Sequence, residues 1–137
     1  MGRMREIKFR YTFKHIGTGN IEKKIYTLKQ LEERNTSELS PCFNKEFGYE
    51  LVSRDQYTGE KDACGNEIYE GDIVYQTFYD RIEEGNGFTG VVKQEEGVWW
   101  IDNEVDNATR LWSEVNPNRI KGNKFESPEL LQGGDKE

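Results

Sequence analysis

Apolar and polar side chains alternate without a break over residues 7–14, near the start of the chain. A period of two is typical of a strand that buries one face. The apolar positions are Ile7, Phe9, Tyr11 and Phe13, and the polar positions are Lys8, Arg10, Thr12 and Lys14. We expect the polar face to be solvated, and a basic surface that binds a polyanion is the alternative.

Weaker patterns predict the rest of the first half. A turn, a strand, a short helix and a loop are expected in that order, at residues 17–20, 25–26, 28–33 and 35–45. Thr27 and Gln30 have the spacing of a helix capping box, which places the start of the helix. The loop is indicated by its density of Asn, Thr, Ser and Pro.

From residue 47 onward, the sequence pattern predicts a series of short strands. They cover residues 47–52, 68–69, 73–78, 88–92, 98–102 and 109–115. Short strands that recur about every 8–12 residues indicate a small barrel or a sandwich. The acidic segment 80–87 is expected to be an exposed loop, and Ser127 to Glu129 to begin a last helical turn.

The stretch from Gln56 to Val74 holds three glycines spaced six residues apart, Gly59, Gly65 and Gly71. We expect each glycine to reverse the chain, with Gly65 at a positive φ that other residues tolerate poorly. Asp72 is interpreted as a turn residue whose carboxylate bonds the backbone. A catalytic role is less favoured because no second group is in view to position a substrate.

Composition limits the size of the hydrophobic core, and charge is unevenly distributed along the chain. Hydrophobic residues make up 34% of the chain, so the seven Tyr, seven Phe and three Trp must supply much of the core. Residues 1–34 carry nine Lys/Arg against four Asp/Glu, a net charge of +5, whereas residues 35–137 carry ten against twenty-two, a net charge of −12. The basic part could contact nucleic acid, the acidic part or another subunit. The overall charge of −7 argues against general binding to phosphate backbones.

Candidate chemistry is sparse. Two cysteines, Cys42 and Cys64, are too few for a disulfide framework, and we expect both to be reduced in a soluble, intracellular protein. Nothing in the sequence places the single histidine, His15, beside a cysteine as a nucleophilic pair, and no paired spacing indicates zinc. Residues 102–107 lack the glycine and glutamate of a calcium loop, so a hairpin turn is favoured. No catalytic, cofactor or metal residues are expected.

The adjacent Trp99 and Trp100 point to opposite faces if they lie on a strand. One can be in the core, and the other must then be exposed or covered by another segment or subunit. A subunit or partner interface is favoured over a platform that stacks bases. The reason is that the neighbouring side chains are acidic: Glu95, Glu96, Asp102 and Glu104.

Three segments of the chain, residues 4–10, 56–74 and 120–131, carry a resemblance to a known family. They resemble the YopX-like family, small proteins encoded by phages and prophages, mainly of Gram-positive bacteria. The central residues that match its signature are Tyr57, Thr58, Gly59, Gly65, Gly71 and Asp72. Cys64 stands where the family usually has Asn, which favours a bulged or longer loop over a two-residue turn.

The resemblance implies a mainly β fold (β-rich α+β) with an SH3-like small barrel in the C-terminal half, and oligomeric assembly. We expect one domain over residues 4–131, with N-terminal strands and a short helix in 4–55 and the barrel in 56–131. Residues 132–137 are expected to be a disordered tail.

The expected function is that of a non-enzymatic, self-associating interaction or assembly protein, a homo-oligomer in the cytoplasm of a bacterial host, without a cofactor or a membrane partner. Its expected interface residues are Trp99, Trp100, Arg5, Lys8 and Arg10. One alternative is a nucleic-acid-associated accessory protein that uses the basic N-terminal strand. Another is a protein that binds a host or phage protein through its acidic surface.

Overall fold

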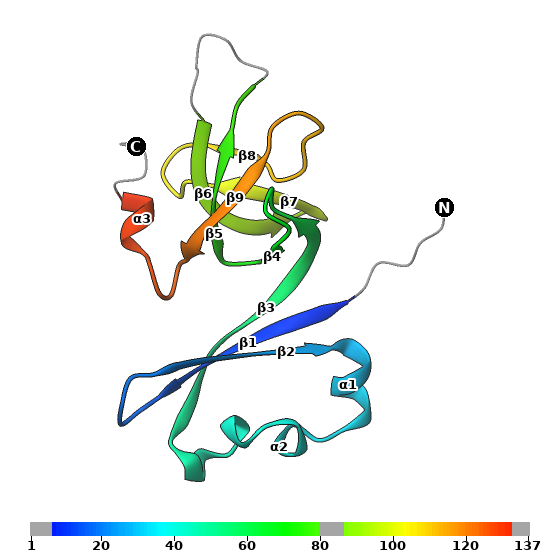
Figure 1. Ribbon diagram of the computed structural model, residues 1–137, viewed down its shortest axis with the longest axis vertical. Coiled ribbons are helices and arrows are strands. Elements are labelled where there is room, and N and C mark those ends of the chain that lie inside the picture. Colours follow the sequence, from blue (N-terminus) through cyan, green and yellow to red (C-terminus); the bar gives the residue numbers. More distant parts are fainter. Residues whose placement is uncertain (1–6, 80–86, 133–137) are drawn as a thin grey trace. The chain divides into compact units, whose positions relative to one another are not determined.

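The computed structural model describes residues 7–79 and 87–132 (Figure 1). The chain divides into two compact units, residues 1–57 (unit 1) and residues 58–137 (unit 2). Strand β3 (Tyr49–Lys61) begins in unit 1 and ends in unit 2. Among the described residues, no helix is both long and apolar enough to cross a membrane. The expectations at Met4–Glu6, at residues 80–86 and for the tail after Gln132 lie outside the described residues.

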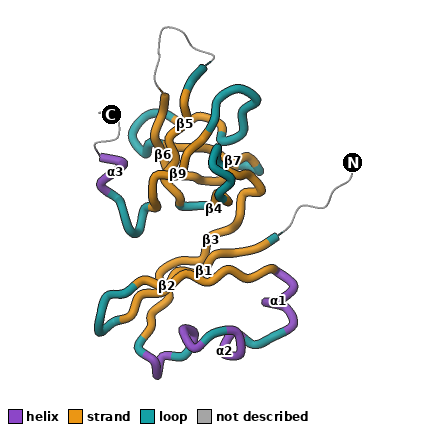
Figure 2. The backbone as a smooth tube through the Cα atoms, viewed as in Figure 1, coloured by secondary structure: helices purple, strands orange, loops and turns teal. Residues whose placement is uncertain are grey.

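Unit 1 contains strands of one antiparallel sheet, with short helical turns between the second and third of them in the chain (Figure 2). The predicted first strand is β1 (Lys8–His15), which pairs with β2 (Ile21–Thr27) on one side and with β3 on the other. The helical elements are α1 (Leu28–Glu33), α2 (Thr36–Leu39), η1 (Pro41–Phe43) and η2 (Lys45–Phe47). The prediction of a loop over 35–45 is therefore wrong in part, because single helical turns form there.

The capping box that the sequence predicts is present. The Thr27 hydroxyl accepts the Gln30 N–H at 3.2 Å, and the Gln30 side-chain oxygen accepts the Thr27 N–H at 2.8 Å. This reciprocal pair satisfies two backbone donors that a helix start leaves without partners. It explains why α1 begins at Leu28, although none of its residues is buried.

Aromatic rings form the core of unit 1. The buried cluster contains Tyr11, Phe13, Tyr26 and Cys42, and Phe43 packs against it. The Phe43 ring meets Phe13 edge to face at 5.0 Å between centroids and Tyr11 at 5.3 Å. Such geometry is favoured by the quadrupoles of the rings. The core therefore joins β1 to the turns that follow α1.

Unit 2 contains a five-stranded antiparallel sheet with the order β8-β7-β6-β5-β9. The elements of this unit after β3 are β4 (Glu67–Tyr69), β5 (Asp72–Thr77), β6 (Gly87–Glu95), β7 (Val98–Asp102), β8 (Ala108–Arg110), β9 (Asn118–Asn123) and α3 (Glu129–Gln132). The fold is thus mainly β, as the sequence predicts, and its strands form two antiparallel sheets. Its core contains Ile68, Val74, Val92, Ile101 and Leu111.

Two sequence predictions in this region are wrong, and one strand is absent from the predictions. The chain does not reverse at Gly59, because β3 continues through it with a φ of 90°. The strand predicted over 109–115 ends at Arg110, where a loop begins. Strand β9 was not predicted, because Ile120 is its one large apolar residue.

Replacement of Phe13 by Ala should destabilise unit 1 by about 3–5 kcal/mol, the usual cost of removing a buried phenyl ring. Phe13 is 1% exposed. Native-state hydrogen exchange of the β1 and β2 amides measures this change. Phe47→Ala is the matched control, because Phe47 is 53% exposed and its loss should change stability by about 0.5 kcal/mol or less. Equal effects of the two variants would contradict the assignment of the core.

Candidate interaction surface

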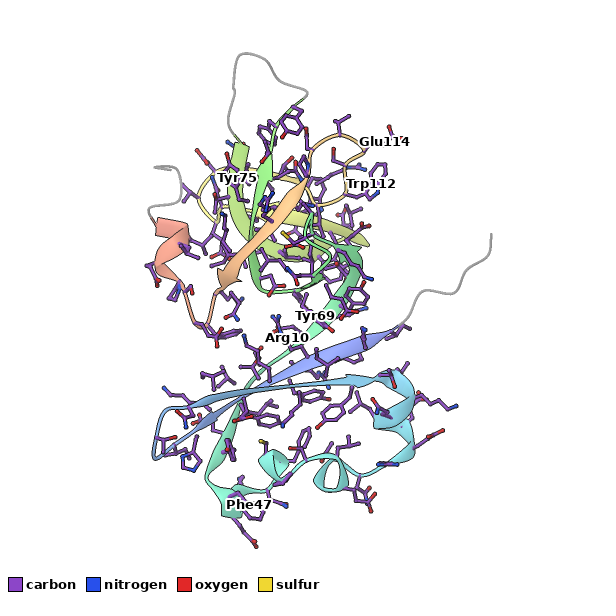
Figure 3. All side chains as sticks on the ribbon, viewed as in Figure 1. Arg10, Phe47, Tyr69, Tyr75, Trp112 and Glu114 are labelled. Atoms are coloured by element: carbon purple, nitrogen blue, oxygen red, sulfur yellow. The ribbon has the colours of Figure 1, made fainter. Side chains whose placement is uncertain are left out.

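A loop over residues 111–117, between β8 and β9, presents large apolar side chains to solvent (Figure 3). Trp112 is 59% exposed and Val115 is 54% exposed. Tyr79, which is 71% exposed, is attached to the same loop because its N–H donates to Asn116 Oδ1 at 2.8 Å. Tyr79, Trp112 and Val115 are called the Trp112 surface below. Exposed apolar clusters of this kind are typical of protein-binding sites.

The start of the loop is held by a buried amide on β5. Gln76 is 1% exposed, and its Nε2 donates to the carbonyl oxygens of Arg110 and Leu111 at 3.0 and 3.3 Å. The same nitrogen donates to Asn118 Oδ1 at 2.9 Å, and Asn118 Nδ2 donates to the Leu111 carbonyl at 2.8 Å. A buried amide without partners is costly, so these bonds fix where the chain leaves β8.

The rest of the loop is held by its own polar groups. The Ser113 hydroxyl accepts the N–H groups of Val115 and Asn116 at 3.2 and 2.9 Å. The Thr77 N–H donates to the Pro117 carbonyl at 3.0 Å, which ties the loop end to β5. The loop therefore displays Trp112 on a backbone that is already ordered. A binding surface that is ordered in advance loses less entropy when a partner docks.

A hollow of about 160 Å³ lies beside Trp112. One wall is the loop, and the other is Glu60 to Ala63, at the end of β3 and the start of the following turn. The Ala63 N–H donates to the Asn118 carbonyl at 2.8 Å, which joins the two walls. This volume is small for a ligand pocket, which typically measures about 300–1,000 Å³, and suits a single side chain of a protein partner.

Asp62 organises the wall opposite the loop. Its carboxylate accepts the N–H groups of Cys64, Asn66 and Ile120 at 2.9–3.1 Å, and it is 7% exposed. Burial by itself raises the pKa of Asp62, but the hydrogen bonds from Ile120, Asn66 and Cys64 outweigh it and hold the pKa below its ordinary value. The charged carboxylate thus fixes the β3–β4 turn and attaches it to β9.

The predicted signature residues lie mainly at turns and in the core. The five-residue connection 62–66 places Gly65 at a φ of 89°, which agrees with the longer loop expected from Cys64. Gly71 also has a φ of 89°, in the turn before β5. Tyr57 and Thr58 are buried on β3, and the Thr58 hydroxyl donates to the Ile68 carbonyl at 2.8 Å.

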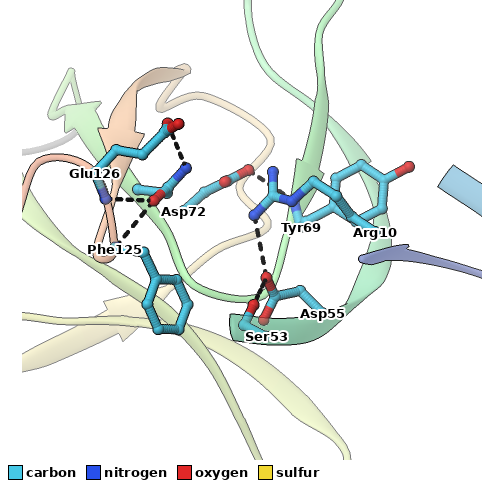
Figure 4. Close-up of polar contacts among 8 residues, drawn as sticks. Arg10, Ser53, Asp55, Tyr69, Asp72, Phe125 and Glu126 are labelled. Carbon is cyan, nitrogen blue, oxygen red and sulfur yellow. Dashed lines mark hydrogen bonds and ion pairs between the residues drawn. The ribbon is translucent and has the colours of Figure 1, made fainter. Parts of the chain in front are cut away.

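Asp72 bonds the backbone, as expected of a turn residue, but its donor precedes it in the chain. Asp72 Oδ2 accepts the Tyr69 N–H at 2.9 Å, and the residue is 2% exposed (Figure 4). The carboxylate closes the turn around Gly71 between β4 and β5. This places Ile73 and Val74, both fully buried, at the start of the next strand.

The exposed tryptophan of unit 2 is Trp112 rather than either member of the predicted pair. Trp99 packs against the core of unit 2. Trp100 is half-buried, and the Arg110 guanidinium lies 5.7 Å from the centroid of its ring. Neither Trp99 nor Trp100 is therefore as exposed as Trp112, which lies on the loop after β8.

The basic strand is engaged within unit 1. Arg10 is 9% exposed, and its Nη2 lies 3.4 Å from Asp55 Oδ2, which also accepts the Ser53 hydroxyl at 2.8 Å (Figure 4). Lys8 Nζ lies 5.0 Å from the centroid of the Tyr57 ring. The expected solvated face is wrong at Arg10, because Asp55 on the neighbouring strand compensates its charge. Arg5 lies outside the described residues.

The remaining polar candidates have structural partners. His15 Nδ1 accepts the Thr18 N–H at 3.1 Å, so the histidine helps to close the β1–β2 hairpin. Cys42 is buried in the aromatic core, whereas Cys64 is exposed. Asn103 Oδ1 accepts three successive N–H groups of its loop, which is the hairpin turn predicted there. Among residues 7–79 and 87–132, no group of three or more His, Cys, Asp and Glu could hold a metal ion.

The chain matches the model of a known protein family. The model of a family described as YopX protein matches residues 8–132, which include β1, the signature stretch and both walls of the hollow. The chain belongs to the YopX protein family. No curated protein matches the chain. The Trp112 surface is identified from the structure.

Sequence reasoning missed the residues that hold this surface, namely Gln76, Asn116 and Asn118. Each is a neutral polar residue that sequence patterns assign to a solvated position. The available signal is Gln76 itself, a polar residue that shares a strand face with the apolar Val74 and Phe78. A buried amide at such a position requires partners on another segment.

Asp62→Asn should lower stability at pH 7 by about 1–3 kcal/mol, because the amide cannot accept the same set of N–H bonds. The wild-type carboxylate has a folded-state pKa below its unfolded value of about 3.9. Its contribution is therefore present above that value and is lost as the pH falls through the folded pKa. Urea unfolding can be followed by tryptophan fluorescence, which reports on unit 2. The difference in free energy of unfolding between wild type and Asp62→Asn should become smaller below about pH 4. A difference that stays constant from pH 7 to pH 3 would contradict this role.

Proposed function

We propose that this YopX-family protein is a non-enzymatic interaction or assembly protein that self-associates. We also propose a phage or prophage origin, mainly among Gram-positive bacteria, and action in the cytoplasm of a bacterial host. The observation that carries the proposal is an exposed tryptophan on a loop that buried amides hold in place. Such a surface supports binding of a protein partner.

The energetics of protein interfaces support this assignment. Tryptophan is enriched among the few residues that dominate binding energy, and these residues insert into well-packed pockets of the partner. Trp112 is on the same exposed loop as Val115 and lines a hollow that fits one side chain. Two carboxylates, Glu60 and Asp62, line that hollow. Asp62 accepts several backbone N–H bonds, so it is poorly suited to act as a general base.

The distribution of charge supports a second copy of the chain as the partner. Unit 1 carries eleven Lys/Arg against eight Asp/Glu, a net charge of +3, and unit 2 carries eight against eighteen, a net charge of −10. Opposite charges on two parts of one chain favour contact between copies and speed their encounter. Association should then weaken as the salt concentration rises.

The strand order supports the finer fold assignment within this proposal, an SH3-like barrel in unit 2. Strands β5 to β8 follow one another as an antiparallel meander, and β9 returns to pair with β5. This succession is compatible with a strongly bent sheet. Among the described residues, no strand pairing joins β8 to β9, the two end strands, so the hydrogen-bonded sheet is open.

Trp112→Ala should weaken self-association roughly 30-fold, as expected for loss of an interface anchor that contributes about 2 kcal/mol. Sedimentation equilibrium over a range of concentrations measures this change. Val105→Ala is the matched control, because Val105 is 83% exposed on a different loop and should leave association unchanged. Equal self-association of the two variants would show that the Trp112 surface does not contribute to the contact between copies. A wild-type protein that stays monomeric at high concentration would exclude self-association and direct attention to a host or phage protein.

The accessory role with nucleic acid is less supported, because Lys8 and Arg10 already contact Tyr57 and Asp55. We expect filter binding to show no retention of DNA or RNA at moderate salt and at most weak retention at low salt. Tight binding that falls steeply with salt, and that Lys14→Glu on the same strand weakens, would overturn this expectation. Lys29→Glu on α1 provides the same change of charge as a control.

A further inference from the structure

Strand β2 has one edge that no strand of the described residues covers. It is the terminal strand of its sheet, with β1 as its neighbour (Figure 1). An exposed edge offers a row of backbone donors and acceptors to another strand. Native proteins usually blunt such edges, and β2 carries lysines that would oppose most pairings.

The hydrogen-bond pattern shows which backbone groups point outward. His15 N–H donates to the Asn20 carbonyl, and Leu28 N–H donates to the Ile7 carbonyl, at the two ends of the β1–β2 ladder. Bonded and non-bonded pairs alternate along an antiparallel ladder. The even-numbered residues of β2 therefore face β1, and the backbone groups of Ile21 and Ile25 face the open edge.

One face of β2 carries Ile21, Lys23 and Ile25, and the other carries Glu22, Lys24 and the buried Tyr26. Ile21 is 37% exposed and Ile25 is 48% exposed, and both lie on the same face of the strand. Glu22 and Lys24 lie on the opposite face, with side chains 43% and 39% exposed. Their ionic contact within the strand, at 3.9 Å, is half-exposed and contributes little to stability.

We propose that β2 pairs with β2 of a second copy in an antiparallel, two-fold arrangement centred on Lys23. This inference rests on the proposed self-association, for which it supplies one contact. In this register Ile21 lies opposite Ile25 of the second copy, and their outward backbone groups can bond directly. Glu22 lies opposite Lys24 of the second copy, and Lys24 lies opposite Glu22.

Neighbouring registers are disfavoured by charge. Outward-facing residues must pair with each other, so allowed registers differ by two residues. A shift in one direction places Glu22 opposite Glu22 of the second copy, and a shift in the other places Lys24 opposite Lys24. Only the register centred on Lys23 forms two opposite-charge pairs and two isoleucine pairs. This register also places Lys23 opposite Lys23 at the axis, a like-charge pair that lowers stability. The two Glu22–Lys24 pairs and the two isoleucine pairs offset this cost, whereas the neighbouring registers have their like-charge pair without them.

The contact forms a continuous sheet across two copies of unit 1 and uses the same patch on both, as a two-fold interface requires. Its shortness, three bonded pairs from Ile21 to Ile25, makes it weak alone. The Trp112 surface lies in unit 2, so the two contacts involve different parts of the chain. Together they would allow an assembly larger than a dimer.

A charge exchange tests the register. Glu22→Lys makes both charges positive and Lys24→Glu makes both negative, so each variant alone places like charges opposite each other. We expect each to dimerise on the order of tenfold more weakly than wild type. An equimolar mixture of the two should recover wild-type association, because all pairs between unlike copies are then of opposite charge. Rescue by mixing cannot arise from misfolding of either variant.

Glu32→Lys and Lys29→Glu on α1 provide matched controls with the same changes of charge on exposed positions. Neither should change association strongly, and mixing them should give no rescue. If wild type associates but the β2 variants behave like these controls, the β2 pairing is wrong and the proposed function stands. If wild type is monomeric at high concentration, both fail.

Discussion

The buried amide of Gln76 is the contact on which the candidate surface depends. It lies on β5, an inner strand of the unit 2 sheet, and donates to the carbonyl oxygens of Arg110 and Leu111, where the chain passes from β8 into the 111–117 loop. Its third acceptor, Asn118, begins β9 and bonds back to Leu111. Since each of these groups would be costly to bury without a partner, the loop has one well-satisfied position. The exposure of Trp112 follows from that position.

Local patterns allowed much of the fold to be predicted. The alternation in β1, the capping box at Thr27 and the turns at Gly65 and Gly71 involve residues close in sequence, where pattern and propensity act directly. The failures involve distant partners. Strand β9 exists because β5 supplies its hydrogen bonds, and Gly59 continues a strand that pairs with β1 and β4. Such pairings have no local signal in one sequence.

The candidate surface was less predictable than the fold. The adjacent Trp99 and Trp100 predict an interface on their strand, and both side chains are partly covered in the structure. Arg10 was interpreted as a solvated charge, but Asp55, distant in sequence, lies beside it. Exposure depends on where a loop is anchored, and the anchors of the Trp112 loop are neutral amides. A pattern of apolar and charged residues contains no information on which amides are buried.

Two surfaces in different units now support one functional account, in which copies of the chain associate through the β2 edge and through Trp112. Both surfaces must become protected from solvent when the protein associates. Hydrogen exchange detected by NMR at two protein concentrations measures this directly. The account predicts slower exchange at the higher concentration for the amides of Ile21 and Ile25 and for the indole N–H of Trp112. Exchange rates that do not depend on concentration at these three sites would contradict it.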